Sequence, residues 1–371
     1  MLLASALVGC TGAASPTPVR LALPAPSDEL HFLVVGDAGA IARDVQPRVG
    51  QAMASACRAS PCDLVLYLGD NFYKSGLPED RDERSGMFAS RFLGPYCGVH
   101  APFFAIVGNH DYGYLGSSVG TLGASPGTEV ALRQLGYGVP GVTDPAERPV
   151  CETGWLGSGP PRWCMPSLDY SVRVGALAGF VGVDTTPLLF RGEQTLVPLR
   201  TYVLAELSRM YALPWRFVFA HHPLRSAGSS HGDAGDYPLY EGDRGGDVRN
   251  LHRTTACRHA DILFTGHDHH LEIRPRDPEC GAAIVISGAG GKLNPLRDDA
   301  QSQVGDLGRA VSEGGFFDVR VRAHSLDIAM VEVPAASPPE RTSWCATKAT
   351  SSARASWARG DCKLPSLEAR R

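Results

Sequence analysis

The stretch Leu64-Val65-Leu66-Tyr67-Leu68-Gly69-Asp70-Asn71 joins five consecutive apolar residues directly to a glycine, an aspartate and an asparagine. A short apolar run that ends in turn residues is typical of a strand buried on both faces. Four other runs follow the same plan and predict further buried strands, each with a polar cluster at its carboxyl end. They are Phe32–Val35 before Gly36-Asp37, Phe103–Val107 before Gly108-Asn109-His110-Asp111, Phe217–Ala220 before His221-His222-Pro223, and Ile262–Phe264 before Thr265-Gly266-His267-Asp268-His269.

Helical patterns lie between these strands. Residues 45–56 are amphipathic, and residues 199–213 carry apolar side chains at helical spacing. Strands that alternate with helices predict an α/β sheet with crossover connections. Two later runs, 316–321 and 325–333, predict a closing antiparallel pair.

The composition limits the class of protein. The 371 residues are 43% hydrophobic and 20% charged, which is enough for a sizeable core and excludes a disordered chain. The formal net charge of −4 gives no basic field, so we expect no nucleic-acid partner. No internal apolar run reaches the roughly 18 residues that a membrane-spanning helix needs.

The polar clusters carry the side chains that bind metal ions. Ligands of α/β sheets bind beyond the carboxyl ends of the strands, and five such ends here carry carboxylate, amide or imidazole groups. A single polar residue at the end of a strand usually serves only to hydrogen-bond the local backbone. Five strand ends of this kind in succession predict a shared binding site. About seven oxygen and imidazole donors exceed the needs of one ion, so the pattern predicts two ions, which could bind both oxygens of a phosphoryl displacement.

In this order, over residues 30–335, the five clusters resemble the signature blocks of calcineurin-like metallophosphoesterases. Residues 69–73 resemble the purple acid phosphatase version, and so do Ser287-Gly288-Ala289-Gly290 and the pair His231-Gly232. The chain length is similar to the short, tartrate-resistant or bacterial form of that subgroup. The resemblance implies an α/β fold in which two mixed β-sheets pack as a sandwich flanked by helices.

The resemblance also implies roles for the metal ligands. The first ion is expected to be Fe(III) and the second Fe(II), Zn(II) or Mn(II). The implied ligands are Asp37, Tyr73 and His269 at the first ion, Asn109, His221 and His267 at the second, and Asp70 as a bridge between the two.

Three further residues are expected to act on the substrate. His110 would contact the phosphate and protonate the leaving alcohol, with Asp111 orienting its ring. His231 would be a second histidine outside the metal ligands, the alternative being a solvated loop histidine. His270 is expected at the surface.

The implied activity is hydrolysis of phosphomonoesters by attack of a metal-bound hydroxide. Two alternatives stay open, a phosphodiesterase or nucleotide hydrolase of the same fold, and a non-catalytic surface-binding lipoprotein. The second is less favoured because degenerate members of such families lose ligands, whereas all seven positions are filled here. The expected partner is a phosphate ester, and the protein is expected to be monomeric.

The N-terminal residues resemble the signal of a bacterial lipoprotein. Residues 1–9 are almost wholly apolar, and Leu7-Val8-Gly9-Cys10 is similar to a lipobox. Export with a lipidated Cys10 as the only membrane link is therefore expected, to the periplasm or cell surface, and a plain secretion signal is the alternative. The implied division is 1–28 as signal and linker, 29–335 as the metallophosphoesterase domain, and 336–371 as a Ser-, Pro- and Arg-rich tail.

Cysteine usage agrees with an oxidising compartment. Beyond Cys10, eight of the nine remaining cysteines form close-spaced pairs, which leaves Cys97 over. The expected disulfides are Cys57 with Cys62, Cys151 with Cys164, Cys257 with Cys280, and Cys345 with Cys362.

Overall fold

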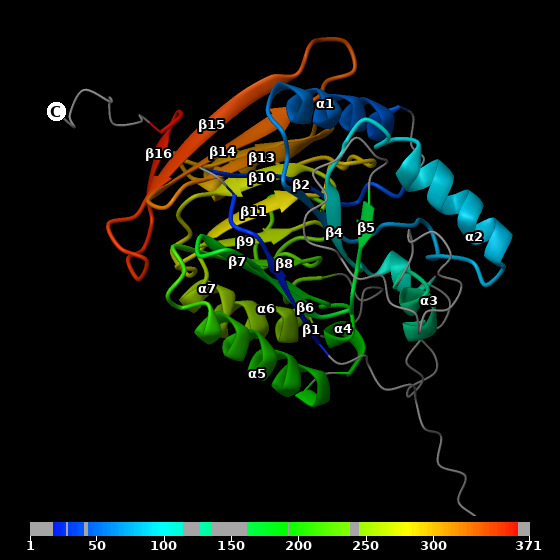
Figure 1. Cartoon of the computed structure of the whole chain (residues 1–371), viewed down its shortest axis with the longest axis horizontal. Coiled ribbons are helices and arrows are strands. Elements are labelled where there is room, and N and C mark those ends of the chain that lie inside the picture. Colours follow the sequence, from blue (N-terminus) through cyan, green and yellow to red (C-terminus); the bar gives the residue numbers. More distant parts are fainter. Residues whose placement is uncertain are drawn as a thin grey trace, which may run out of the picture.

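The computed structural model describes residues 18–26, 29–40, 44–113, 127–135, 162–191, 193–237 and 245–362. These residues form two mixed sheets of eight strands that pack face to face, with helices on their outer sides (Figure 1). The predicted α/β sandwich flanked by helices is confirmed. Among the described helices, none combines the length and hydropathy needed to cross a membrane.

The first sheet is called the β2 sheet and has the order β16-β15-β14-β13-β2-β3-β4-β5. Its last four members pair in parallel, so their carboxyl ends share one edge. The strands are β2 (Leu30–Val35), β3 (Leu64–Leu68), β4 (Pro102–Ile106), β5 (Arg162–Cys164), β13 (Gly315–Val321), β14 (Ser325–Glu332), β15 (Glu340–Thr347) and β16 (Ser356–Arg359).

The second sheet is called the β8 sheet and has the order β1-β6-β7-β8-β9-β11-β10-β12. Strands β7, β8, β9 and β11 are parallel neighbours. The members are β1 (Val19–Leu23), β6 (Tyr170–Val174), β7 (Ala178–Val183), β8 (Trp215–Ala220), β9 (Ile262–Thr265), β10 (Leu271–Arg274), β11 (Ala283–Ser287) and β12 (Arg309–Val311).

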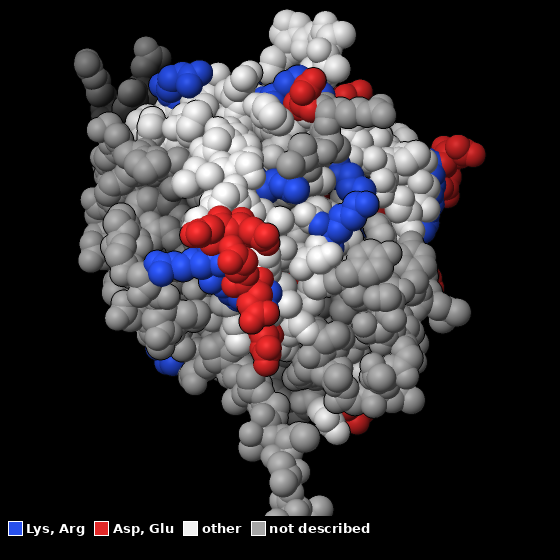
Figure 2. All heavy atoms as spheres, turned by 90° about the vertical axis from the view of Figure 1, so that its right-hand side faces the viewer, with Lys and Arg blue, Asp and Glu red and all other residues white. Residues whose placement is uncertain are grey.

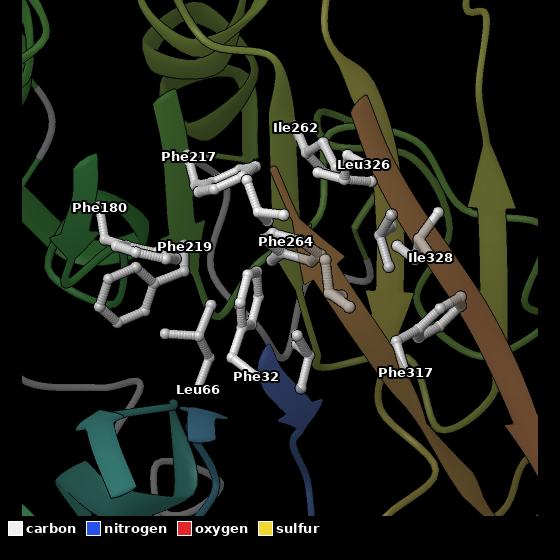
Figure 3. Close-up of a cluster of buried hydrophobic side chains, with 14 of the residues drawn as sticks. Phe32, Leu66, Phe180, Phe217, Phe219, Ile262, Phe264, Phe317, Leu326 and Ile328 are labelled. Atoms are coloured by element: carbon white, nitrogen blue, oxygen red, sulfur yellow. The ribbon is translucent and has the colours of Figure 1, made fainter. Parts of the chain in front are cut away.

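Apolar side chains from both sheets fill the space between them (Figure 3). Phe32 of β2 packs edge-on against Phe180, Phe217 and Phe264 of the opposite sheet, with ring centroids 5.3, 5.7 and 6.0 Å apart. Edge-to-face contacts of this kind add to the stabilisation from burial. This core fixes the two sheets relative to each other, and therefore fixes the relative positions of their strand ends.

Helices cover the outer sides of both sheets (Figure 1). Against the β2 sheet lie α1 (Val45–Ala59), α2 (Arg81–Phe88) and η1 (Ala89–Leu93), and against the β8 sheet lie α4 (Leu188–Arg191), α5 (Glu193–Arg209), α6 (Gly245–Thr254) and α7 (Ala256–His259). The short η2 (His110–Tyr112), α3 (Thr128–Leu132) and α8 (Ala300–Val304) lie in connections. The helix predicted over 45–56 extends to residue 59, and that predicted over 199–213 is shifted toward the N-terminus.

The described fold extends beyond both predicted domain limits. Strand β1, inside the range assigned to signal and linker, pairs in parallel with β6. Strands β15 and β16, inside the range assigned to a tail, continue the β2 sheet beyond β14. The physical reason is a two-residue alternation that composition conceals, because Trp344 and Ala346 point into the core while their neighbours are exposed or half-buried.

Three predicted disulfides are confirmed, namely Cys57–Cys62, Cys257–Cys280 and Cys345–Cys362. Cys97 is a free, exposed thiol, as expected. Cys10 and Cys151 lie outside the described residues, so the lipobox and the fourth pairing stay predictions.

The face on which α2 and α3 lie is mixed in charge (Figure 2). Acidic and basic side chains lie side by side on it, in keeping with a formal net charge of only −4. This part of the described surface therefore presents no single-sign field.

Candidate metal centre

The parallel strands of both sheets direct their carboxyl ends to one place. Asp37 follows β2, Asp70 follows β3, and Asn109 follows β4, while His221 follows β8 and the 267–269 segment follows β9. The two sheets are tied together at this point, because Nδ1 of His221 donates a hydrogen bond of 2.8 Å to the carbonyl oxygen of Leu68. The sandwich thus brings together residues that are up to 232 positions apart in the sequence.

A glycine stands directly before several of these residues, and each is needed for close approach. A Cβ at Gly69 would lie 2.7 Å from Nδ1 of His221, and one at Gly266 would lie 2.5 Å from Oδ2 of Asp37. A Cβ at Gly108 would overlap the carboxylate of Asp70. The glycines of the sequence blocks therefore make room for the functional side chain of another block.

The backbone at this place is strained. Asp37, Asp70 and His267 have φ angles of 55°, 52° and 69°, in the left-handed region that L residues rarely occupy. Such conformations cost of the order of 1–3 kcal/mol each and persist where the surrounding structure holds them. Hydrogen bonds supply that restraint, since the backbone N–H of His267 donates to Oδ2 of Asp37 at 2.8 Å.

One group of donor atoms comes from Asp37, Tyr73 and His269. The Tyr73 hydroxyl lies 3.1 Å from Oδ1 of Asp37 and 3.1 Å from Nε2 of His269, and these last two atoms are 3.6 Å apart. Donor atoms that share an ion at about 2.1 Å lie roughly 3.0–3.4 Å from one another. The spacing of this group therefore fits a metal ion.

A second group comes from Asn109, His221 and His267. Oδ1 of Asn109 is 3.1 Å from Nε2 of His221 and 3.1 Å from Nδ1 of His267. Oδ1 of Asp70 lies 3.4 Å from Nε2 of His221, at the edge of this group. The donor atoms of Asp37, Asp70 and His221 all lie within 4.8 Å of one another, so Asp70 stands between the two groups.

The second group presents lone pairs to one another. The Leu68 carbonyl can only accept, so Nδ1 of His221 carries the proton. Burial lowers the pKa of His221, which keeps the ring neutral and leaves a bare lone pair on Nε2. That lone pair faces the amide oxygen of Asn109 and the carboxylate of Asp70, both of which are acceptors. A cation among these three atoms satisfies them all.

The pKa shifts of the buried groups also favour a bound cation at this place. Burial and the Asp70 carboxylate raise the pKa of Asp37 well above its usual range. Burial disfavours ionisation of Asp70 too, but attraction to His221 and His110 in their protonated forms opposes it and holds the pKa of Asp70 below its usual value. Burial lowers the pKa values of His267 and His269, which keeps both rings neutral as metal ligation requires.

His110 lies at the rim of the site. Its ring packs against Tyr73, with centroids 4.3 Å apart, and Nε2 lies 3.9 Å from Oδ2 of Asp70. Nδ1 donates to the carbonyl oxygen of Lys74 at 2.8 Å. The side chain is 29% exposed, so it can meet a ligand that enters the site.

Asp111 does not orient the His110 ring, contrary to the sequence-based expectation. Its buried carboxylate accepts hydrogen bonds from the backbone N–H groups of Asn71, Phe72 and Gly108 at 2.8–3.1 Å. The backbone carbonyl of Lys74 takes the orienting role instead. Asp111 therefore fixes the loops after β3 and β4 against each other. Its position next to His110 in the sequence does not reveal this role.

His231 is brought to the site and is half-buried. Its ring centroid lies 4.1 Å from that of His267 and 5.9 Å from that of His269. Asp268, between these two ligands in the sequence, accepts hydrogen bonds from the backbone N–H groups of His231 and Gly232, each at 3.3 Å. Asp268 also accepts a hydrogen bond from the hydroxyl of Ser226.

Two further histidines, His222 and His270, lie beside the donor groups. The position of His270 differs from the one expected, and His222 adds a possible metal-binding atom. His270 is fully buried rather than at the surface, because Nε2 bonds to Oε2 of Glu272 at 2.8 Å, and Glu272 also pairs with Arg274. His222, which sequence reasoning did not assign to the metal, places a donor atom near His221 and His267. Its Nδ1 shares a hydrogen bond of 2.8 Å with the hydroxyl of Thr185.

Comparison with known proteins agrees with this geometry. The family model for calcineurin-like phosphoesterases matches residues 30–271. The chain is 25% identical to tartrate-resistant acid phosphatase type 5 of Mus musculus over 333 residues, which cover 83% of this chain and 88% of that protein. It is 24% identical to purple acid phosphatase 3 of Arabidopsis thaliana over 334 residues, with 85% and 78% covered.

Solved structures share the fold. One titled as GAP50, the anchor in the inner membrane complex of Plasmodium, superposes with a TM-score of 0.61 at 16% identity, covering 88% of this chain and 91% of that one. A structure of PhoD gives a TM-score of 0.55 at 13% identity, covering 95% and 74%. The family model spans more than half of the chain, including β2 to β9 and all the blocks from Asp37 to His269, so the chain belongs to the calcineurin-like phosphoesterases and is a metal-dependent hydrolase of phosphate esters.

Proposed function

We propose that the protein is a binuclear phosphomonoesterase of the purple acid phosphatase type. The observation that carries this proposal is the pair of donor groups, one around Tyr73 and one around Asn109, with Asp70 between them. Each group has the spacing of ligands around one ion. The names of the relatives, which are acid phosphatases, favour monoesters as substrates.

The donor chemistry favours two different ions. Asp37, Tyr73 and His269 would hold Fe(III), because a phenolate is a hard, anionic ligand. Asn109, His221 and His267 would hold Fe(II), Zn(II) or Mn(II), since a neutral amide keeps that position less negative. When bound, such a pair of ions neutralises charge on the phosphoryl oxygens and activates water as the nucleophile.

The residues of the chain supply the proton and the positioning. Nδ1 of His110 is held as a donor by the Lys74 carbonyl, so in the protonated ring the N–H at Nε2 would give its proton to the leaving alcohol, which leaves the ring neutral. The ring of His231 packs against that of His267, and its segment is fixed by hydrogen bonds to Asp268. It would contact the phosphoryl oxygens or the leaving group from there.

The nearest alternative is hydrolysis of phosphodiesters or nucleotides at the same centre. Two long, Gly-rich segments of the sequence, 113–166 and 226–250, lie partly outside the described residues, and because loops of this length are usually functional we expect them to set the choice between the two activities. The kcat/KM values for monoesters and diesters distinguish the two activities.

The deciding experiment is a panel of phosphomonoesters and phosphodiesters offered to the purified chain between pH 5 and pH 8. We expect monoesters to be hydrolysed with the higher kcat/KM, and hydrolysis to stop with a chelator and return with iron plus Zn(II) or Mn(II). Higher kcat/KM values for diesters would favour the alternative. A protein that binds about two ions but hydrolyses neither class would contradict the proposal.

Replacing Asp70 by alanine tests the bridge. Each donor group then loses the carboxylate that stands between them, so we expect at least one ion per chain to be lost together with nearly all hydrolysis. Metal content is measured by elemental analysis. The control is Asp82→Ala, which removes an exposed carboxylate on α2 and should leave the metal content unchanged. An Asp70→Ala protein with full metal content and wild-type turnover would show that Asp70 does not bridge.

Replacing Tyr73 by phenylalanine tests the identity of the first ion. Burial and the carboxylates of Asp70 and Asp37 raise the pKa of Tyr73 well above its usual value, so only a strongly charged ion nearby would hold it as phenolate. The iron-loaded, oxidised wild type should then absorb visible light by phenolate-to-iron charge transfer, and Tyr73→Phe should lose that band while remaining folded. A colourless iron-loaded wild type would exclude Tyr73 as a ligand.

We also propose export with a lipid on Cys10. The run Leu7-Val8-Gly9-Cys10 supports this, and the three described disulfides agree with an oxidising compartment. Mass spectrometry of the mature N-terminus should find a diacylated Cys10 at the first position. An N-terminus that retains Met1, or an unmodified Cys10, would contradict it.

A further inference from the structure

A glycine-rich segment beside the metal centre carries a lysine that the assigned ligands and acids do not include. Residues 288–291 follow β11 and lead into Lys292. The segment packs on the loop of Asp37, since a Cβ at Gly290 would lie 2.6 Å from the carbonyl oxygen of Gly36, and the N–H of Gly290 donates to that oxygen at 3.1 Å. The glycines therefore allow the chain to pass close to the centre.

The segment is held on both sides of Lys292. Before it, the N–H of Gly288 donates to the carbonyl of His270 at 3.1 Å. After it, the N–H of Asn294 donates to the carbonyl of His269 at 3.0 Å, and the Asn294 carbonyl accepts from the hydroxyl of Ser312. The backbone of Lys292 is thus fixed relative to a metal ligand.

The ammonium group of Lys292 lies against the centre, and no described carboxylate pairs with it. Nζ is 5.3 Å from the ring centroid of Tyr73, and the side chain is half-buried. Burial raises the pKa of Asp37, and the charge of Lys292 is among the influences that oppose this rise. Among the described residues, Lys292 forms no ion pair within 4.0 Å, whereas the buried Lys348 pairs with Asp261 at 2.9 Å.

A second cation of the same segment, Arg297, lies near His231. A Cβ at Gly232 would be 2.5 Å from Nη2 of Arg297, so this guanidinium packs on the backbone next to His231. In the described part of the chain, Arg297 also has no carboxylate within 4.0 Å. The 292–297 segment therefore places two positive charges beside the centre, and neither pairs within 4.0 Å with a carboxylate of the residues that the structure describes.

We propose that Lys292 is a substrate-binding residue whose ammonium group holds an anionic phosphoryl oxygen and favours dianionic monoesters over monoanionic diesters. This deepens the proposed function and rests on it. The electrostatic attraction to a fixed cation scales with the charge of the ligand. At pH 7 a phosphomonoester, with a second pKa of about 6, carries nearly two negative charges, whereas a diester carries one.

The test compares Lys292→Met with wild type at pH 7. Methionine keeps the length and packing over Tyr73 and removes the charge. We expect kcat/KM for a monoester to fall about 10- to 100-fold, the range for a hydrogen bond between charged groups, and that for a diester to fall only a few-fold. Lys292→Arg should retain most of the monoester activity, and metal content should be unchanged.

The matched control is Arg173→Met, which removes one exposed positive charge from β6, opposite the first residues of β7 and away from the carboxyl ends. It should leave both substrates unaffected. Equal losses on both substrates in Lys292→Met, or the same loss in Arg173→Met, would overturn the proposal.

Binding of inorganic phosphate separates this inference from the proposed function, because it needs no turnover. Calorimetry on the metal-loaded protein should show phosphate bound about tenfold or more weakly by Lys292→Met, and also by Lys292→Gln if the methionine variant folds poorly. Unchanged phosphate affinity would overturn the role of Lys292. Weakened phosphate binding in a protein that hydrolyses no ester would support Lys292 as an anion site and reject the phosphomonoesterase.

Discussion

The burial of two carboxylates at one point is the constraint on which the site depends. Asp37 and Asp70 are both almost completely buried, with donor atoms no more than 4.8 Å apart. Two negative charges at that distance repel by about 3–4 kcal/mol even at an effective dielectric constant near 20, before the cost of desolvation. Neighbouring side chains offset only part of this, as the raised pKa of Asp37 shows. Bound cations remove the conflict, and the neutral imidazoles around the carboxylates are suited to ligate them.

This constraint accounts for features that look unrelated in the sequence. The donor atoms converge only if five loops from two sheets approach closely, and the glycines at 69, 108 and 266 make that approach possible. The left-handed backbone of Asp37, Asp70 and His267 is the strain that accompanies it. The aromatic core between the sheets holds the loops in place, because it sets the separation of the strands that carry them.

The sequence predicts that these side chains lie together, as the structure shows, because the signal is local. An apolar run followed by a glycine and a polar side chain predicts both a strand and the group at its carboxyl end. Because ligands of α/β sheets bind beyond the carboxyl ends of the strands, five such runs are enough to predict that these groups share one site. Interactions between segments far apart in the sequence leave no such signal. The composition of residues 336–371 predicts a tail, and only the pairing of β15 with β14 reveals that Trp344 enters the core. The role of Asp111 is equally hidden in the sequence, since its partners belong mostly to another loop.

Asp268 shows how the two donor groups and the segment of His231 are joined by hydrogen bonds. It lies between His267 and His269, which belong to different donor groups, and its buried carboxylate holds the 226–232 segment through Ser226, His231 and Gly232. A Cβ at Gly228 would lie 2.8 Å from this carboxylate, so the segment rests directly on it. A displacement of His267 or His269 therefore moves the support of His231 as well. The same strand end also fixes Asn294, next to the segment of Lys292 and Arg297. One loop after β9 thus fixes the positions of His267, His269, His231 and the 292–297 segment together, so a change of residue order at this single turn would displace all of them.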